Sequence, residues 1–468
     1  MNDYLTYLSD FFKNYARKLE EREIAKNIEY NKINIDYFSK SKKGDISSNF
    51  YLIILNKILD KNFKLKEDLV YNLEKITFIK SAEIPNTNFI NIFLYKEYFY
   101  EQLKEVINEK NSYGNSKIGN NQNVNIEFVS ANPTGPIHVA HMRGAVFGDV
   151  LASIFNKTGY NITREYYVND SGTQIDILSK SLYKRYCQIF NMNVSINNDE
   201  YPGDYLKKIA KKISVTDSDK WLKIEESKRH KFFKDYAVRE LVNQIRNDLQ
   251  LLNINFDIFT YESNIQKQNI IDELFVILNE KKLLYEGILD KPKTEDNSEW
   301  EPRKQLLFKS TNLFDDRDRP LKKANGEWTY FANDAAYHYD KYKRKFDIII
   351  NVWGADHIGY VPRMKSIVSS ITNKDNYLEI LICQIVRLMK NSKILKMSKR
   401  EGNFITLNEI FDKVGKDPLR YFMISTRNET SMDFDLDKVV EKNKDNNVFY
   451  CQYAYARACS VLNKAKEN

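Results

Sequence analysis

Cysteine is scarce in this 468-residue chain, which contains only Cys187, Cys383, Cys451 and Cys459. The four are scattered and form neither a CxxC pair nor the dense pattern of a small disulfide-bonded domain. They therefore exclude a disulfide framework and a cysteine-based zinc site. We expect reduced cysteines, no metal ion held by the protein itself, and a cytoplasmic location.

Long apolar runs are also absent. Nothing approaches the roughly 18 consecutive apolar residues of a membrane span. The N-terminal MNDYLTYLSDFFKNYARKLEE mixes both charge signs with apolar residues, unlike a signal peptide. We expect neither a signal peptide nor a membrane span. The chain has no strong charge imbalance, because 72 Lys and Arg stand against 64 Asp and Glu, a surplus of +8. This mild surplus suits a polyanionic partner without identifying one.

The residues that are present predict an α/β protein. From Val124, strand-like NIEFVS is followed by a turn, a helix reaching about Lys157, and strand-like ITREYYV. A second unit lies in DIIINVWGADHIGYVPRMKSIVSSI, where an apolar strand over 347–353 leads through Gly354 into a helix. Two such units predict the halves of a doubly wound parallel sheet of the Rossmann type.

The flanking segments differ from this core. Residues 1 to about 110 alternate helical and strand-like stretches, which indicates an N-terminal α+β domain, and the polar NSYGNSKIGNNQN that follows reads as a linker. Residues 187–245 are charged and helical and are expected to form an insertion beside the sheet. After Asp417 the chain is predicted to be mostly helical, ending in an all-helical C-terminal segment.

Two of only five histidines, His138 and His141, stand three residues apart in SANPTGPIHVAHMRGAVFGD. Pro136 fits an early helix position, and the TGP turn lets the backbone approach a ligand at the helix N-terminus. Two imidazoles on one helix face there could donate hydrogen bonds to charge developing on a phosphoryl group. An HxxH pair alone is more often two satisfied polar residues at a helix start. It also lacks the HExxH spacing and third ligand of a metal site.

A second motif lies far downstream in NSKILKMSKREGNFITL, which places Lys396 and Lys399 in a loop with Ser398 and Gly402. Alone, such a lysine-rich loop is usually a solvated surface, but it can also close over a triphosphate. Together HVAH and KMSK resemble the HIGH and KMSK motifs of class I aminoacyl-tRNA synthetases. Longer strings resemble the arginyl-tRNA synthetase family, in order: IEFVSANPTGPIHVAHMRGAVFGD, REYYVNDSGTQI, YPGDYL, DRPL, YFANDAAYHYDK, GADHIGYVPRMK, KMSKREGNFITL and DPLRYFMISTRNETSMDFDLD.

The resemblance runs from about residue 44 to the C-terminus and implies an activity and its partners. The family activates L-arginine with ATP and Mg²⁺, forming arginyl-adenylate and pyrophosphate, and transfers arginine to the 3′ end of tRNA(Arg). Its members typically need bound tRNA even for the first step. We expect a monomer. The implied domains are 1–115 as a tRNA-contacting domain, 120–380 as the Rossmann catalytic domain with the 187–245 insertion, 381–440 as the KMSK loop and stem-contact region, and 441–468 as the start of a helical anticodon-binding domain.

An arginine site needs carboxylates, because a guanidinium is best read by carboxylate oxygens in a planar fork. By resemblance, Glu127, Tyr330 and Asp334 would hold the guanidinium. Asn132 and Asn169 would orient the α-amino and carboxylate ends, with Ser130 and Gln174 close by. Each of these residues also has an ordinary structural explanation, such as a capping asparagine, a surface acid or a core tyrosine.

The nucleotide side follows from the two motifs. By resemblance, His138 and His141 would bind phosphate oxygens, and Lys396 and Lys399 the departing β- and γ-phosphates, making these four the catalytic residues. The full set expected to bind ATP is Pro133, Thr134, Gly135, His138, Ala140, His141, Asp356, His357, Met397, Ser398 and Lys399.

Two features depart from the family pattern. Ala140 replaces the glycine that usually lets the adenine ring lie against the backbone. Relatives also continue well past the helix that starts near Asn446. The second departure leaves open a synthetase-like tRNA-binding protein with impaired charging. A small-molecule adenylating enzyme is a further alternative, against which the N-terminal domain and the YFAND segment argue.

Overall fold

The computed structural model of the protein describes residues 4–37, 44–289, 304–323, 325–391, 393–395 and 405–467. The chain divides into two compact units, Met1–Asn115 and Ser116–Asn468. Within the described ranges, no helix is long and apolar enough to cross a membrane.

The first unit packs helices on an antiparallel four-stranded sheet in the order β1-β2-β4-β3. Its core is rich in aromatic rings, and Phe12 stacks on Phe50 with ring centroids 4.5 Å apart. The elements are α1 (Tyr4–Glu21), β1 (Ile35–Asp36), β2 (Ile46–Ser48), α2 (Phe50–Leu55), α3 (Leu65–Glu74), β3 (Ile79–Glu83), β4 (Ile90–Leu94) and α4 (Lys96–Glu109).

The second unit is built on a five-stranded parallel sheet in the order β12-β11-β5-β6-β7. The chain runs outward from β5 (Asn123–Glu127) through β6 (Asn161–Val168) to β7 (Ile258–Tyr261). It then places β11 (Ile348–Gly354) and β12 (Leu378–Cys383) on the other side of β5. This reversal confirms the predicted doubly wound, Rossmann-type sheet. Ligands bind where the strand order reverses, so the carboxyl ends of β5 and β11 mark the candidate site.

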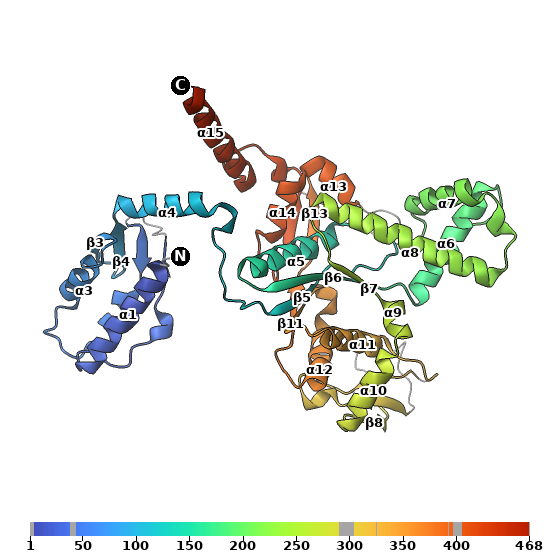
Figure 1. The fold of residues 1–468 in the computed structure, drawn as a ribbon, viewed down its shortest axis with the longest axis horizontal. Helices are drawn as coiled ribbons and strands as arrows, with labels where there is room; N and C mark the ends of the chain where they lie inside the picture. Colours follow the sequence, from blue (N-terminus) through green and yellow to red (C-terminus); the bar gives the residue numbers. More distant parts are fainter. Residues whose placement is uncertain are drawn as a thin grey trace. The chain divides into compact units, whose positions relative to one another are not determined.

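Helices cover both faces of this sheet (Figure 1). On β11, Ile350 and Val352 join the core that contains the apolar residues of α5 (Val139–Lys157), whereas Ile349 joins the opposite core. That second core is formed with α10 (Ile270–Glu280), α11 (Tyr330–Lys343) and α12 (Val361–Thr372). Because successive strand residues alternate between faces, an almost wholly apolar strand such as IIINVWG must be buried on both sides.

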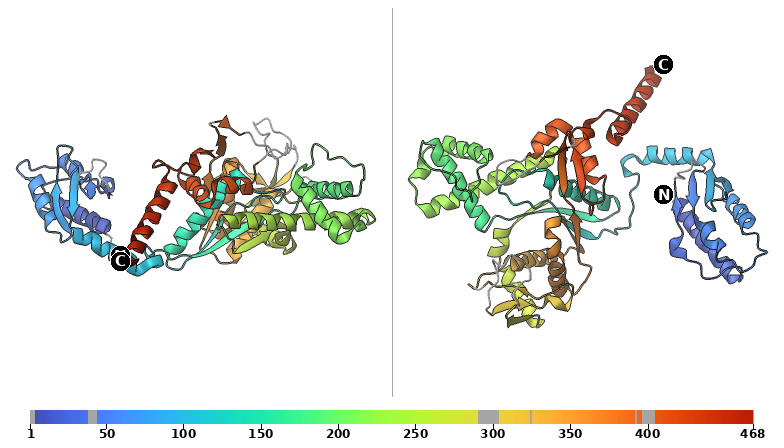
Figure 2. Two further views of the ribbon diagram at one scale, coloured as in Figure 1. Left: turned by 90° about the horizontal axis from the view of Figure 1, so that it is seen from above. Right: turned by 180° about the vertical axis from the view of Figure 1, so that it is seen from behind.

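The helical insertion consists of α6 (Thr173–Ile189), α7 (Asp204–Asp217) and α8 (Glu226–Leu251), which lie side by side in Figures 1 and 2. Between α8 and α11 stand α9 (Glu262–Lys267), α10 and a small antiparallel sheet of β8 (Leu284–Gly287), β9 (Gln305–Phe308) and β10 (Arg319–Pro320).

The region after β12 contains β13 (Val386–Lys390), β14 (Lys393–Ile394), α13 (Leu407–Val414), α14 (Lys416–Ile424), β15 (Met432–Asp435) and α15 (Asn447–Glu467). The chain after Asp417 was expected to be mostly helical, and this is only partly right, because β15 lies there. The missed strand β15 pairs in parallel with β13 and buries Met432 and Phe434 while exposing the residue between them. This alternation is the period-2 pattern of a half-buried strand. In α15 only Val448 is buried.

Candidate active site

His138 and His141 stand at the start of α5, directly after the turn that follows β5. Pro136 was expected inside the first helical turn, and this is wrong, because His138 is the N-cap and the helix begins at Val139. The Nδ1 atom of His138 accepts the N–H of Ala140 at 3.3 Å, and the Nδ1 atom of His141 accepts the N–H of His138 at 3.4 Å. The two ring centroids are 4.1 Å apart. Because each Nδ1 accepts a hydrogen bond, a proton on either ring lies on Nε2.

The segment that follows the second motif in the sequence contacts this helix start. His138 forms an isolated antiparallel bridge with Thr406, and the N–H of Leu407 donates to the carbonyl of Ile137 at 3.0 Å. Thr406 immediately follows the KMSK loop and caps α13 in a reciprocal box with Glu409. Thr406 and Leu407 therefore lie beside His138 and Ile137. The expected site residues Lys396, Met397, Ser398 and Lys399 lie outside the described residues.

Arg143, one turn into α5, is a residue that the sequence reasoning missed. It is almost completely buried, and its guanidinium donates to the backbone carbonyls of Gln384, Thr426, Arg427 and Thr430 at 2.7–3.2 Å. Burial lowers the pKa of this guanidinium, which has only neutral hydrogen-bond acceptors. Arg143 thus ties the histidine helix to the segments on either side of the KMSK loop.

The TGP turn is covered by the helical insertion. The Tyr205 hydroxyl on α7 donates to the carbonyl of Thr134, and its ring lies over Gly135. Pro133 is buried as well. A nucleotide bound at this turn would contact mainly backbone atoms of the turn rather than its side chains.

Asp356 and His357 follow β11 and lie at the sheet's switch point, as expected from their position in GADHIGY. They belong to a 3-10 helix over Ala355–Tyr360, and both side chains are exposed. The Nε2 atom of His357 lies 3.4 Å from Oδ2 of Asp356.

On the arginine side, Glu127 ends β5 and is buried in an ion pair with Lys341 of α11. The Nζ–Oε2 distance is 2.7 Å, and the lysine side chain is completely buried. Ser130, which has a positive φ of 37°, donates its hydroxyl to Oε1 of the same carboxylate at 2.9 Å. The protein itself therefore already neutralises the charge of Glu127.

Asn132 and Gln174 lie together, as their expected shared role requires. The Asn132 amide donates to Oε1 of Gln174 at 3.1 Å, and both residues are exposed. Asn169, after β6, lies against Glu262 at the start of α9. In the amide orientation that satisfies both of its atoms, its nitrogen donates to Oε2 of Glu262 at 2.8 Å.

Tyr330 and Asp334 occupy the first turns of α11. Tyr330 is exposed, and its hydroxyl is near the NDSG turn, at 3.4 Å from where a side chain at Gly172 would begin. Among the described residues, the Asp334 carboxylate accepts one hydrogen bond, from the Tyr360 hydroxyl at 2.8 Å, and forms no ion pair. Burial raises the pKa of the Asp334 carboxyl to about 7, with a smaller contribution from the charges of Glu262 and Glu127.

The acid Glu262 is a second residue that the sequence reasoning missed. Only 3% of its surface is exposed, and burial raises the pKa of its carboxyl. The sequence offers little indication of a functional role for Glu262, because Tyr-Glu-Ser after a short strand is an ordinary helix start.

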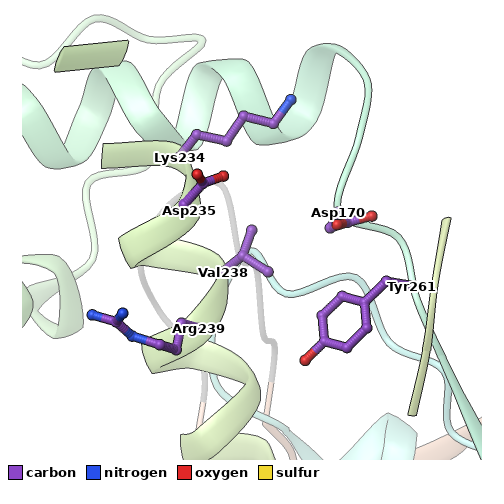
Figure 3. A pocket seen from close by; sticks show the side chains of 6 residues that line it. All are labelled: Asp170, Lys234, Asp235, Val238, Arg239 and Tyr261. Carbon is purple, nitrogen blue, oxygen red and sulfur yellow. The ribbon is translucent and has the colours of Figure 1, made fainter. Parts of the chain in front are cut away.

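A pocket of about 200 Å³ opens next to Asn169, between α8 and the loop after β6 (Figure 3). The neighbouring Asp170 is fixed by the N–H and hydroxyl of Ser263 at 2.9 and 2.6 Å. The pocket thus brings side chains of both charges and one aromatic ring close to the arginine side. It is lined by Asp170, Lys234, Asp235, Val238, Arg239 and Tyr261.

Comparison with known sequences gives two family matches. The family described as "tRNA synthetases class I (R), catalytic domain" matches residues 102–453. The family "Arginyl tRNA synthetase N terminal domain" matches residues 8–94.

Individual relatives are similar over most of their length. The chain is 44% identical over 426 residues to the arginine–tRNA ligase of Orientia tsutsugamushi (strain Boryong), covering 91% of this chain and 72% of that protein. It is 42% identical over 422 residues to the arginine–tRNA ligase of Wolbachia pipientis wMel, covering 90% and 74%.

Solved structures agree. One from Campylobacter jejuni, provisionally described as an arginyl-tRNA synthetase, is 32% identical with a TM-score of 0.70, covering 80% of this chain and 78% of its own. The arginyl-tRNA synthetase of Thermus thermophilus shares the fold at 17% identity and a TM-score of 0.66, covering 98% and 82%.

Proposed function

The chain belongs to the arginyl-tRNA synthetase family, and from that premise we propose how its residues share the work of an arginine–tRNA ligase. The enzyme uses ATP to activate L-arginine and joins the arginine to tRNA. The observation that carries the residue assignment is Asp334, a carboxylate without a cationic partner among the described residues, at the same sheet edge as His138. Arginine-dependent exchange of pyrophosphate into ATP tests the assignment.

In the first step, no protein nucleophile is required. The arginine carboxylate attacks the α-phosphorus of ATP in line, and the bond to the departing pyrophosphate breaks. Catalysis is then positioning plus stabilisation of phosphate charge. His138 and His141 donate from Nε2 to phosphate oxygens at the N-terminus of α5, where the helix dipole also favours negative charge. In the second step, a hydroxyl at the tRNA 3′ end attacks the arginyl carbonyl and AMP leaves.

The loop beyond Leu395 supplies the cations for the departing phosphates. Replacing Lys399 with alanine is expected to cost about 2 kcal/mol in transition-state stabilisation, or roughly 30-fold in kcat/KM for exchange. The dissociation constant for arginine should hardly change, since the lysine acts on the nucleotide. Lys390→Ala, at an exposed lysine of β13, is the matched control. Near-wild-type pyrophosphate exchange in the Lys399 variant would contradict this role.

Ala140 is exposed at the start of α5, so its methyl group has room beside the nucleotide. Its N–H is already committed to His138. We expect Ala140→Gly to lower the Michaelis constant for ATP by less than about tenfold, since a glycine there adds backbone freedom without adding a contact. Steady-state exchange kinetics check this, and a larger decrease would show that the methyl group obstructs the adenine ring.

Recognition of arginine is proposed to centre on Asp334, with Tyr330 beside it. The guanidinium would bind the ionised carboxylate, and Ser130, Asn132, Asn169 and Gln174 would orient the rest of the substrate. Glu127 shapes this site while its charge is balanced by Lys341. A neutral isostere of arginine would leave the buried carboxylate unpaired, and such a site rejects it by roughly 10⁴-fold.

The pKa of Asp334 near 7 predicts that arginine binding depends on pH. Only the ionised carboxylate attracts the guanidinium, so a proton must leave before arginine binds and acid weakens binding. For a pKa of about 7, the dissociation constant should be about tenfold higher at pH 6 than at pH 8. Calorimetric titration at both pH values measures this ratio. Asp334→Asn should reduce the dependence, and a ratio near one in the wild type would contradict the proposal.

We assign Asp356 and His357 to contacts with adenosine or arginine, and Pro133, Thr134 and Gly135 to the nucleotide through their backbone. Mg²⁺ is proposed to arrive with ATP, chelated mainly by phosphates, because it retains several waters and rarely uses an all-protein cage. The described residues contain no cluster of three potential ligands that would argue otherwise.

The proposed roles of the domains follow the family. Residues 1–115 would contact tRNA, 120–380 would carry out activation, 381–440 would hold the KMSK loop and contact the tRNA stem, and 441–468 would begin the anticodon-binding domain. We further propose a monomer in the cytoplasm, where its tRNA substrate is used. Light scattering of the purified chain tests the first of these two points.

A further inference from the structure

Four carboxylates stand at or close to the carboxyl ends of the strands near Tyr167. Glu127 ends β5, Asp170 follows β6, Glu262 follows β7, and Asp334 lies on α11. After burial, the largest causes of the high pKa of the Tyr167 phenol are the charges of these four groups. The Tyr167 phenol therefore lies in the combined field of several negative charges.

Of the four carboxylates, Glu127 has a cationic partner, because it is paired with Lys341. Asp170 accepts the backbone N–H and hydroxyl of Ser263, which are neutral donors, but it lines a pocket together with the cationic side chains of Lys234 and Arg239. Glu165, which lies on β6 two residues before Tyr167, also has a cationic partner. Both of its carboxylate oxygens accept from the Arg344 guanidinium at 2.9 Å.

The other two carboxylates are not balanced within the described ranges. Asp334 has the Tyr360 hydroxyl as its hydrogen-bond donor. Glu262 accepts from the amides of Gln266 and Asn333, both at 3.2 Å, and from Asn169. All of these donors are neutral. Glu262 is buried and Asp334 is half-buried, and Asn333 beside Asp334 donates to Glu262, so the two carboxylates lie in one region. Without a cation such a pair is costly and favours a ligand that brings positive charge.

The Tyr167 hydroxyl is buried and, among the described residues, has no hydrogen-bond partner. Its ring is held in place, because it stacks on Tyr337 at 4.2 Å and its backbone N–H donates to the Ser130 hydroxyl at 3.0 Å. Buried hydroxyls are nearly always paired. A buried hydroxyl without a partner, in the field of four carboxylates, is a group that a polar atom of a ligand would satisfy.

We propose that Glu262 and Tyr167 are specificity-determining residues of the arginine site. Arginine places a cationic group between Glu262 and Asp334, and a polar atom of the same substrate pairs with the Tyr167 hydroxyl. This assignment rests on the proposed function and adds two residues to the site. In this assignment Asp334 and Glu262 carry the negative charge that binds arginine. Glu127 shapes the site while its own charge is balanced by Lys341.

Tyr167→Phe separates a binding role from a structural one. In the arginine-free protein the hydroxyl has no partner to lose, so the melting temperature should stay the same or rise. The dissociation constant for arginine should increase about tenfold, as expected for one lost hydrogen bond to a charged ligand. Tyr377→Phe is the matched control, because that buried hydroxyl donates to the carbonyl of Phe346 at 2.9 Å. It should lower the melting temperature and leave arginine binding unchanged.

Glu262→Gln keeps the shape of the side chain and removes its charge. Arginine affinity should fall about 50-fold, as for other buried charge contacts, whereas affinity for citrulline, the neutral isostere, should change less than about twofold. Glu273→Gln makes the same change at a half-exposed carboxylate on α10 and should alter neither ligand. In a double variant with Asp334→Asn, the losses should be less than additive, because both acids face one cation.

The proposal is overturned if Tyr167→Phe lowers the melting temperature as Tyr377→Phe does while arginine binds normally, or if Glu262→Gln weakens arginine and citrulline equally. Failure of the wild-type chain to bind arginine would instead refute the proposed function.

Discussion

Asp334→Asn is expected to raise the dissociation constant for arginine about 150-fold, equivalent to roughly 3 kcal/mol for losing one partner of a desolvated charge pair. The substitution is isosteric. It keeps a side-chain oxygen that can accept the Tyr360 hydroxyl, which donates to the Asp334 carboxylate at 2.8 Å in the wild type. The fold should therefore remain, and the melting temperature should not fall. Removing a buried carboxylate whose pKa is raised to about 7 relieves its desolvation in the arginine-free protein at neutral pH.

The measurement is calorimetric titration with arginine, together with the Michaelis constants for arginine and ATP in pyrophosphate exchange. The ATP constant should change less than about twofold, because the proposal assigns this carboxylate to arginine and not to the nucleotide. Asp272→Asn, at an exposed carboxylate in the first turn of α10, provides the control. Equal losses for arginine and ATP would show that Asp334 supports the site as a whole and does not bind the guanidinium.

Arg143→Met is expected to destabilise the second unit by about 4 kcal/mol, because four buried carbonyls lose their donors together. The methionine keeps much of the volume, so packing is only slightly disturbed. The melting temperature should fall by roughly 5 °C in a unit of this size. Because Arg143 joins α5 to the segments around the KMSK loop, kcat/KM for ATP should fall as well.

Arg239→Met, at an exposed arginine of α8, is the comparison variant for stability. Arg143→Lys should fall between the wild type and Arg143→Met, since one ammonium cannot reach all four carbonyls that the planar guanidinium bridges. A melting temperature within about 2 °C of wild type for Arg143→Met would contradict this prediction. It would show that water replaces the guanidinium as the donor to the four carbonyls.

The sequence predicted the sheet and the neighbourhood of the site because these depend on local patterns. Strands such as IIINVWG are apolar throughout, and each is followed by a turn and a helix, which is sufficient to predict a doubly wound sheet. The sequence also predicted that HVAH would stand at a helix start. It placed Pro136 wrongly, because the reciprocal capping by the two histidines begins the helix later than a proline at N1 would.

What could not be predicted depends on partners distant in the chain. Lys341 lies 214 residues from Glu127, and nothing in YHYDK indicates that its ammonium is buried against that carboxylate. The acceptors of Arg143 are carbonyls more than 240 residues away, which carry no sequence signal. In the sequence, Tyr167 is an ordinary aromatic residue of a strand. Only the structure shows that its hydroxyl is buried without a hydrogen-bond partner among the described residues. Charge balance in a buried site is a property of the folded arrangement.

The most direct test of the account is ATP–pyrophosphate exchange by the purified chain, assayed with and without tRNA(Arg) and with arginine, lysine or citrulline as substrate. The account predicts exchange that requires arginine, is strongest with tRNA present, and is absent with the other two amino acids. Exchange supported equally by lysine, or no exchange with arginine even when tRNA is bound, would contradict it.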